Sequence, residues 1–136
     1  MVGIVLVSEN KEGAEMLKTA RRLLGRIEGF ATVMLKPGSS NARMRKALQR
    51  AINKINADHG ILILYDIFGS TQCNTCRRFL KRGAVELITG FNMAMLVKLA
   101  TINKTMPLKK LVPFIEKYGR EHIAVVSSKR RPIIVG

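Results

Sequence analysis

A pair of carboxylates is the strongest chemical signal in this sequence. Glu9 comes just after the apolar run Val2–Val7, and Asp66 comes directly after a second apolar run, Ile61–Tyr65. Because open α/β folds place their sites where parallel strands end, we expect the two side chains to lie at one edge of a sheet. A carboxylate can act as a nucleophile, and two carboxylates side by side raise the pKa of one of them unless a cation intervenes.

Short apolar runs that alternate with helical patterns must position this pair. Strands are predicted at Val2–Val7, Ala31–Leu35, Ile61–Tyr65, Val85–Thr89 and Ile123–Ser127, and helices at Glu12–Leu24, Asn41–Ile55, Thr71–Lys81, Asn92–Ile102 and Pro107–Tyr118. This alternation predicts a three-layer α/β fold, an open and mainly parallel sheet with helices on both faces. We expect residues 1–127 to form a single domain and 128–136 a basic C-terminal tail.

Three turns follow the predicted strands in register. They are Ser8-Glu9-Asn10, the stretch from Asp66 to Asn74, and Gly90-Phe91-Asn92. Together they resemble the IIA component of the mannose family of the bacterial sugar phosphotransferase system. The resemblance implies that Asp66 orients a catalytic group, and that the phosphate and partner site is lined by Ser8, Asn10, Gly69, Ser70, Thr71, Asn74 and Asn92.

Glu9 stands where the mannose family has the histidine that carries the phosphoryl group. The resemblance therefore implies a degenerate IIA domain, kept for regulation or protein interaction, that needs no cofactor. One alternative is an active carrier in sugar uptake or a regulatory phosphorelay, with an acyl phosphate on Glu9. His59 and His122 fall outside the three turns, so neither is expected to replace the missing imidazole.

The resemblance also implies partners. It predicts a phosphotransferase-system or regulatory protein as partner, and a homodimer in which a C-terminal strand crosses between subunits. Ile123–Ser127 is the candidate for that exchange, as an antiparallel strand at the sheet edge.

Charge is the unusual total of the chain. Its 24 Lys and Arg against 9 Asp and Glu give a net charge of +15. Solubility of a small domain needs a net charge of only about 2–8, so the excess favours an anionic partner such as nucleic acid or an acidic protein. This supports a second alternative, an anion-binding module on the same scaffold, with candidate residues Arg43, Lys46, Arg50, Lys54, Arg77 and Arg78.

Cys73 and Cys76 form a C-x-x-C motif at the start of a predicted helix. Their helical spacing with Leu80 favours core packing over redox chemistry, and the further ligands that a zinc site needs are not nearby, so no metal is expected. No apolar run approaches the roughly 20 residues of a membrane-spanning helix, and Met1 leads straight into a strand without a signal peptide. We therefore predict a cytoplasmic protein.

Overall fold

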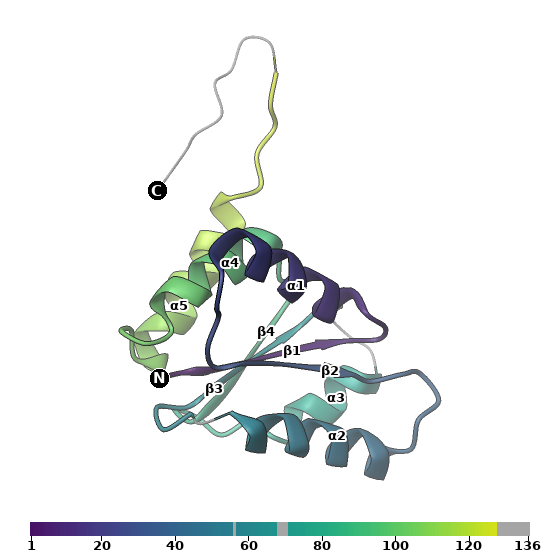
Figure 1. The fold of residues 1–136 in the computed structure, drawn as a ribbon. Coiled ribbons are helices and arrows are strands. Elements are labelled where there is room, and N and C mark those ends of the chain that lie inside the picture. The colour runs from purple at the N-terminus through teal and green to yellow at the C-terminus, as the bar shows by residue number, and fades with distance from the viewer. Residues whose placement is uncertain (56, 68–70, 128–136) are drawn as a thin grey trace.

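Four parallel strands form the sheet in the part of the chain that the structure describes (Figure 1). The structure is a computed structural model that describes residues 1–55, 57–67 and 71–127, with the side chains of residues 71 and 72 left out. The strands are β1 (Gly3–Ser8), β2 (Phe30–Met34), β3 (Ile61–Tyr65) and β4 (Val85–Thr89). Their order is β2-β1-β3-β4, so β1 and β3 occupy the centre and β2 and β4 the two edges.

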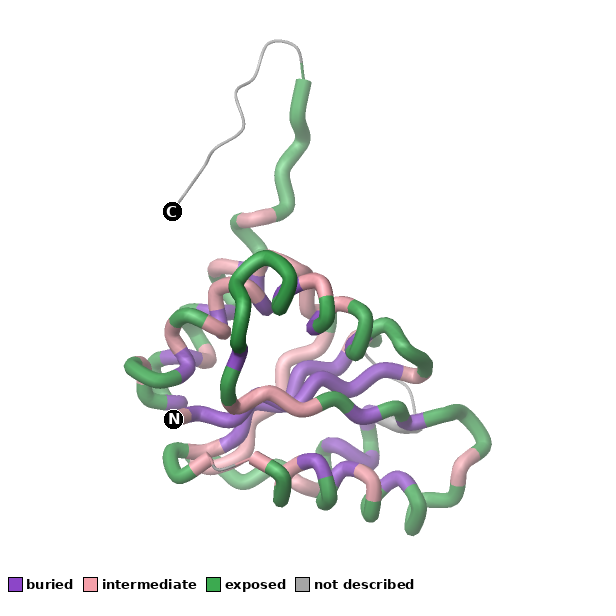
Figure 2. Tube along the Cα trace, viewed as in Figure 1, coloured by how far each residue is buried: buried purple, intermediate pink, exposed green. Residues whose placement is uncertain are grey.

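The two central strands are buried on both faces, as their uninterrupted apolar sequences predict. Every residue of β1 and of β3 is buried, and Figure 2 shows both strands as the innermost part of the molecule. They pair in parallel, with Ile4 opposite Leu62 and Leu6 opposite Leu64. Because successive side chains along a strand point to opposite faces of the sheet, each strand contributes side chains to two separate cores.

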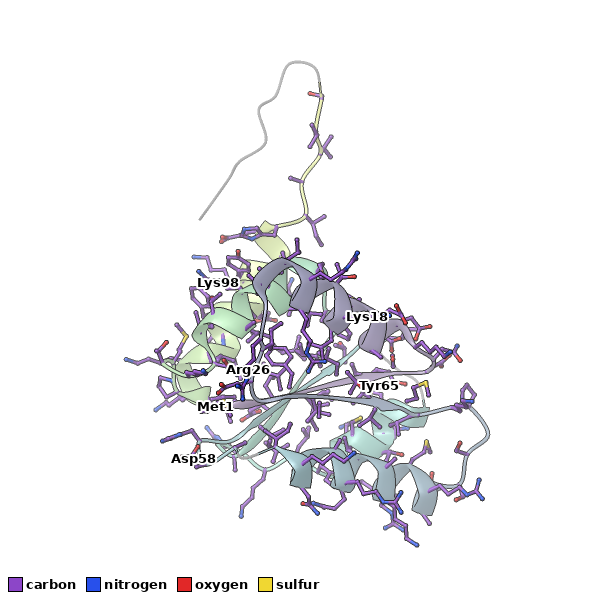
Figure 3. The ribbon with its side chains drawn as sticks, viewed as in Figure 1. Met1, Lys18, Arg26, Asp58, Tyr65 and Lys98 are labelled. Carbon is purple, nitrogen blue, oxygen red and sulfur yellow. The ribbon has the colours of Figure 1, made fainter. Side chains whose placement is uncertain are left out.

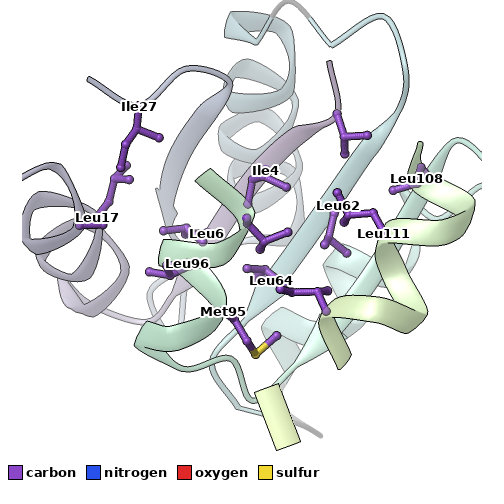
Figure 4. Close-up of a cluster of buried hydrophobic side chains, with 14 residues drawn as sticks. Ile4, Leu6, Leu17, Ile27, Leu62, Leu64, Met95, Leu96, Leu108 and Leu111 are labelled. Carbon is purple, nitrogen blue, oxygen red and sulfur yellow. The ribbon is translucent and has the colours of Figure 1, made fainter. Parts of the chain in front are cut away.

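Helices cover the two faces of the sheet and complete the three-layer α/β fold (Figure 1). On one face lie α1 (Glu12–Leu24), α4 (Met93–Ile102) and α5 (Leu108–Glu121), and on the other lie α2 (Asn41–Lys54) and α3 (Thr71–Arg77). Figure 4 shows the first core, in which Leu62 and Leu64 meet Leu96 and Leu111. The second core holds Val5, Ile63, Met44, Leu48 and Cys76, among others.

Two helix ends differ from the sequence prediction by more than one residue. Helix α5 runs three residues beyond the expected end at Tyr118, because Gly119 does not stop it. Gly119 is buried where α5 crosses Met95 of α4, and a Cβ at this position would collide with the Met95 side chain. Helix α3 ends at Arg77 instead of Lys81, because the chain then tightens into turns, such as Phe79 N–H to Cys76 O (3.0 Å).

The predicted strand Ile123–Ser127 is not part of the four-stranded sheet. Figure 1 shows this segment leading away from the end of α5, and its apolar side chains are exposed: Ile123 76%, Val125 73% and Val126 68%. Within the described residues, the segment does not pair with any of the four strands of the sheet. The predicted basic tail, 128–136, lies outside the described residues. Across the described ranges, no helix combines the length and the apolar character that crossing a bilayer requires.

Candidate functional site

The carboxyl ends of β1, β3 and β4 are tied together by backbone hydrogen bonds. The Asp66 N–H donates to the Val7 carbonyl (3.3 Å), and the Gly90 N–H donates to the Tyr65 carbonyl (2.7 Å). Tyr65, labelled in Figure 3, marks the end of β3 at this edge. The turns that begin at Ser8, Asp66 and Gly90 therefore start from one edge of the sheet, as predicted.

Asp66 is the most perturbed group at this edge. Its Oδ1 atom is buried and accepts no hydrogen bond from the described residues. Burial raises the pKa of the Asp66 carboxyl above its ordinary value, and the negative charges of Glu12 and Glu9 raise that pKa further. Glu9, Glu12 and Asp66 thus act on one another through space, and we call these three carboxylates the acidic site.

Glu12 is the member of the acidic site that sequence reasoning missed. It begins α1, and its Oε2 accepts a hydrogen bond from the Asn10 N–H (3.0 Å). A carboxylate is favourable there, because the first turn of a helix presents free N–H groups. The sequence feature that could have indicated Glu12 is its position three residues after Glu9, at the start of the predicted helix that follows the same turn.

Ser8 supports the first turn from within. The residue is buried, with 1% of its surface exposed, and its Oγ donates to the Asn10 carbonyl (2.8 Å). The same oxygen accepts a hydrogen bond from the Gly13 N–H (3.2 Å), which fixes the start of α1 against the end of β1. The Ser8 hydroxyl is therefore occupied in shaping the turn, while Asn10 and Glu9 reach the surface.

Asn92 holds two helices together. Its Oδ1 accepts a hydrogen bond from the Met95 N–H (3.0 Å) and caps α4, and its Nδ2 donates to the Gly119 carbonyl of α5 (3.0 Å). Both ends of the amide are used within the fold, so the structure gives Asn92 a packing role at the site edge.

The other residues of the predicted loops are placed only in part. Asn74 is exposed on α3, and the backbone of Thr71 begins that helix. Gly69 and Ser70 lie outside the described residues.

Both histidines of the chain lie away from the acidic site. The Nδ1 atom of His59 is 2.7 Å from the Met1 amino group, at the opposite edge of the sheet where β1 and β3 begin. His122 follows α5 and stacks on Tyr118, with 3.8 Å between the ring centroids. Neither imidazole is placed to take over the chemistry expected at position 9, as the sequence predicted.

The C-x-x-C motif is part of the second core. Cys73 and Cys76 are buried, with 4% and 0% of their surfaces exposed, which confirms the prediction of core packing. Burial raises the pKa of the Cys76 thiol to about 12, so at neutral pH it is not the thiolate that a redox or nucleophilic cysteine requires. No three His, Cys, Asp or Glu side chains among the described residues are grouped so as to hold a metal ion.

The predicted anion-binding residues form a separate surface. All six are exposed on the second layer of helices or the turn after it: Arg43, Lys46, Arg50, Lys54, Arg77 and Arg78. The carboxylates and the cations thus belong to different elements, so the structure does not merge them into one site.

An Asp66→Asn substitution is expected to stabilise the protein at neutral pH. The pKa of Asp66 is raised on folding, so its native state favours the protonated form, and ionisation above that pKa costs stability. The gain should shrink as the pH falls and disappear below 3.8, the ordinary aspartate value, where both variants carry no charge at position 66. Urea unfolding of both proteins across this pH range measures the difference.

Asp58→Asn is the matched control, with the opposite sign. A hydrogen bond from the N-terminal amino group lowers the pKa of Asp58, so its ionised form supports the fold at neutral pH. Removing that charge should lower the stability at neutral pH and leave it unchanged in acid. Equal effects of the two substitutions would contradict the assigned environment of Asp66.

The sequence is similar to proteins of the bacterial phosphotransferase system. A protein-family model named EIIA-man and described as the fructose IIA component of the phosphotransferase system matches residues 3–116. The mannose-specific EIIAB component of Escherichia coli K12 is 26% identical over 130 residues, 94% of this chain, and the chain spans 40% of that protein. The fructose-specific EIIA component of Bacillus subtilis is 19% identical over 128 residues, 93% of this chain and 88% of that protein.

Solved structures share the fold. A phosphotransferase-system EIIA component from Streptococcus agalactiae superposes with a TM-score of 0.79 at 22% identity, covering 92% of this chain and 97% of that one. A mannose/sorbose-specific IIA subunit from Enterococcus faecalis gives 0.79 at 18% identity, covering 98% of each chain. At this level of identity the likeness concerns the arrangement of strands and helices.

Proposed function

Because the chain belongs to the EIIA-man family of the phosphotransferase system, we propose that it is a IIA domain that has lost phosphoryl transfer. In this proposal it works in the cytoplasm by contact with a phosphotransferase-system or regulatory protein. The observation that carries the proposal is the acidic site, which has a glutamate where the family resemblance places the phosphoacceptor histidine.

The electrostatics of the acidic site support the loss of carrier function. A phosphoryl group adds a charge of about −1.5 to −2 near neutral pH. On Glu9 it would stand beside the carboxylates of Glu12 and Asp66, and the pKa of Asp66 is already raised, first by burial and then by the charges of Glu12 and Glu9. The carboxylate at position 9 supplies a permanent negative charge in place of a transient one.

A carrier that forms an acyl phosphate on Glu9 is the competing function. Carboxylates do act as nucleophiles in some phosphoryl transfers. The net charge of +15 also slows the approach of the family's phosphoryl donor, which presents positive charge to an acidic acceptor. The two functions differ in one observable, which is covalent phosphate on the unmodified chain.

The test is phosphotransfer from labelled phosphoenolpyruvate through enzyme I and the histidine-containing phosphocarrier protein. We expect no label on the unmodified chain, while a standard IIA component in the same mixture is labelled. Label that appears on the chain and disappears in Glu9→Ala would establish the acyl-phosphate carrier and overturn the proposal.

We also propose a homodimer in which Ile123–Ser127 of each copy pairs with the partner's β4. Two features support it. Strand β4 lies at an edge of the sheet beside a groove of about 390 Å³, lined in part by Leu87, Thr89 and Met95. The candidate strand exposes the apolar side chains of Ile123 and Val125, which such a pairing would cover.

Sedimentation velocity should show a dimer for the unmodified chain and a monomer for Ile123→Asp/Val125→Asp, because the charges would be buried in the exchanged strand. Leu23→Asp is the control, since Leu23 is 67% exposed on α1. An unmodified chain that sediments as a monomer at all concentrations would exclude the exchange.

A further inference from the structure

On one side of the sheet, the helices carry cations without any carboxylate among them. Helix α2 and the end of α3 carry seven exposed cations, which we call the basic face: Arg43, Arg45, Lys46, Arg50, Lys54, Arg77 and Arg78. Figure 3 shows nitrogen-tipped side chains projecting from α2 away from the sheet. The opposite side of α2, with Met44, Leu48 and Ala51, is buried in the second core, so the helix presents its charged side outward.

No acidic residue interrupts this surface within its own elements. The sequence contains no Asp or Glu between Asn41 and Ala57, nor between Thr71 and Val85. A solvated helix face ordinarily mixes both signs, because alternating charges support the helix through pairs one turn apart. Like charges at this spacing repel one another and destabilise α2, and an anionic partner would relieve this repulsion.

The ion pairs of the protein lie elsewhere. Among the described residues they join Arg26 and Lys104 to Glu28, Lys117 to Glu121, Arg120 to Glu116, and the N-terminus and His59 to Asp58. In this part of the chain, no cation of the basic face has a carboxylate within ion-pair distance. The face is therefore available to an external anion.

The spacing of the cations suits a polymer of phosphates. Arg43, Lys46, Arg50 and Lys54 follow one another at three, four and four residues along α2. At 1.5 Å per residue they stand about 4.5–6 Å apart on a helix about 21 Å long. This row is long enough to face several phosphates of a duplex, which carries one charge per about 1.7 Å of its axis. Arg77 and Arg78 add charge beside this row, because α3 packs against α2.

Two other classes of partner fit less well. A membrane-binding helix inserts large apolar side chains, and α2 exposes none of them, since its apolar side is buried. A protein interface has an apolar centre with aromatic residues, and Phe79, half-buried beside Arg45 and Lys46, is the described aromatic residue at this surface. The scarcity of aromatic groups also argues against stacking on single strands.

We propose that the basic face binds the phosphate backbone of duplex nucleic acid without reading its sequence. The binding is independent of the proposed loss of phosphoryl transfer, because it uses α2 and α3 and none of the residues of the acidic site. The acidic site lies on the turns after β1 and β3, where it would repel the same polymer and so leave the basic face as the contact surface.

The experiment measures fluorescence anisotropy of a labelled duplex of about 20 base pairs, as DNA and as RNA, with the full chain at several salt concentrations. We expect binding to at least one duplex, unrelated sequences to bind alike, and log K to fall linearly with log salt. In Arg43→Gln/Lys46→Gln/Arg50→Gln the slope should fall by about 3, and the affinity at about 100 mM salt should fall at least tenfold.

The control variant removes the same charge from the other layer. In Lys18→Gln/Lys109→Gln/Lys110→Gln the three substituted lysines are exposed on α1 and α5. This variant should keep nearly the full salt dependence and affinity of the unmodified chain. Circular dichroism checks that both variants are folded. Equal losses in the two variants, absence of binding to either duplex, or tighter binding to polyglutamate or anionic vesicles than to the duplexes would each overturn the proposal.

Discussion

A Glu9→His variant is expected to accept a phosphoryl group from phosphoenolpyruvate, through enzyme I and the phosphocarrier protein, where the unmodified chain accepts none. The substitution replaces one carboxylate of the acidic site by an imidazole, whose neutral nitrogen is a competent nucleophile near pH 7. It also removes one of the charges that raise the pKa of Asp66. Autoradiography of the protein band measures the label directly.

Asp66 is the reason to expect that one substitution suffices. Its buried Oδ1 has no hydrogen-bond partner among the described residues, and a buried acceptor without a partner is costly. An imidazole N–H at position 9 could donate to this carboxylate, which would orient the ring and stabilise its positive form. The rest of the edge is already held by the backbone bonds from Asp66 to Val7 and from Gly90 to Tyr65.

Two further variants separate the effect of the charge at position 9 from the effects of the imidazole nucleophile and of its partner Asp66. Glu9→Gln removes the charge without adding a nucleophile and should stay unlabelled. Glu9→His/Asp66→Ala keeps the nucleophile but loses its partner, and should label more slowly than Glu9→His. A folded Glu9→His protein that takes up no label would mean that the scaffold, and not the residue at position 9 alone, has lost the capacity for transfer.

Leu64→Ala is expected to lower the free energy of unfolding by about 3–5 kcal/mol, a large part of the roughly 5–15 kcal/mol that stabilises a domain. Leu64 has no exposed surface and lies in the central strand β3, where it packs in the first core with Leu96 and Leu111 (Figure 4). Truncation leaves a cavity that backbone paired on both sides cannot collapse to fill.

Leu23→Ala provides the matched control for this core. The same atoms are removed from a side chain that is 67% exposed, so the change should stay within about 0.5 kcal/mol. Urea unfolding followed by circular dichroism measures both variants. A loss below about 1 kcal/mol for Leu64→Ala would be incompatible with a leucine packed on all sides.

Much of the fold could be predicted from local sequence. β1 and β3 carry uninterrupted apolar runs, as expected for strands covered on both faces. Met44, Leu48 and Ala51 recur at the spacing of one helix face, which predicts α2. The ends of elements were less accessible. Gly119 ordinarily marks a helix end, but here it lies inside α5 because Met95 of α4 occupies the space of a side chain.

The candidate site divides in the same way. The sequence by itself determined that Glu9 and Asp66 follow parallel strands and therefore share an edge, since strand order and direction follow from the alternation of elements. It also determined that Cys73 and Cys76 face the core, through their helical spacing. Both conclusions depend on where each residue stands within or just after its own strand or helix, and the pattern of apolar residues along the chain shows that position.

Only the tertiary structure decided what the side chains at that edge do. It brought Glu12 into the acidic site and tied Asn92 to the carbonyl of Gly119, 27 positions away. It also separated the basic face, which lies on α2 and the end of α3, from the carboxylates, which lie on the turns after β1 and β3 and at the start of α1. Such relations depend on distances between residues far apart in sequence, which are set by the packing of helices on the sheet, and a periodic pattern within one segment contains no information about them.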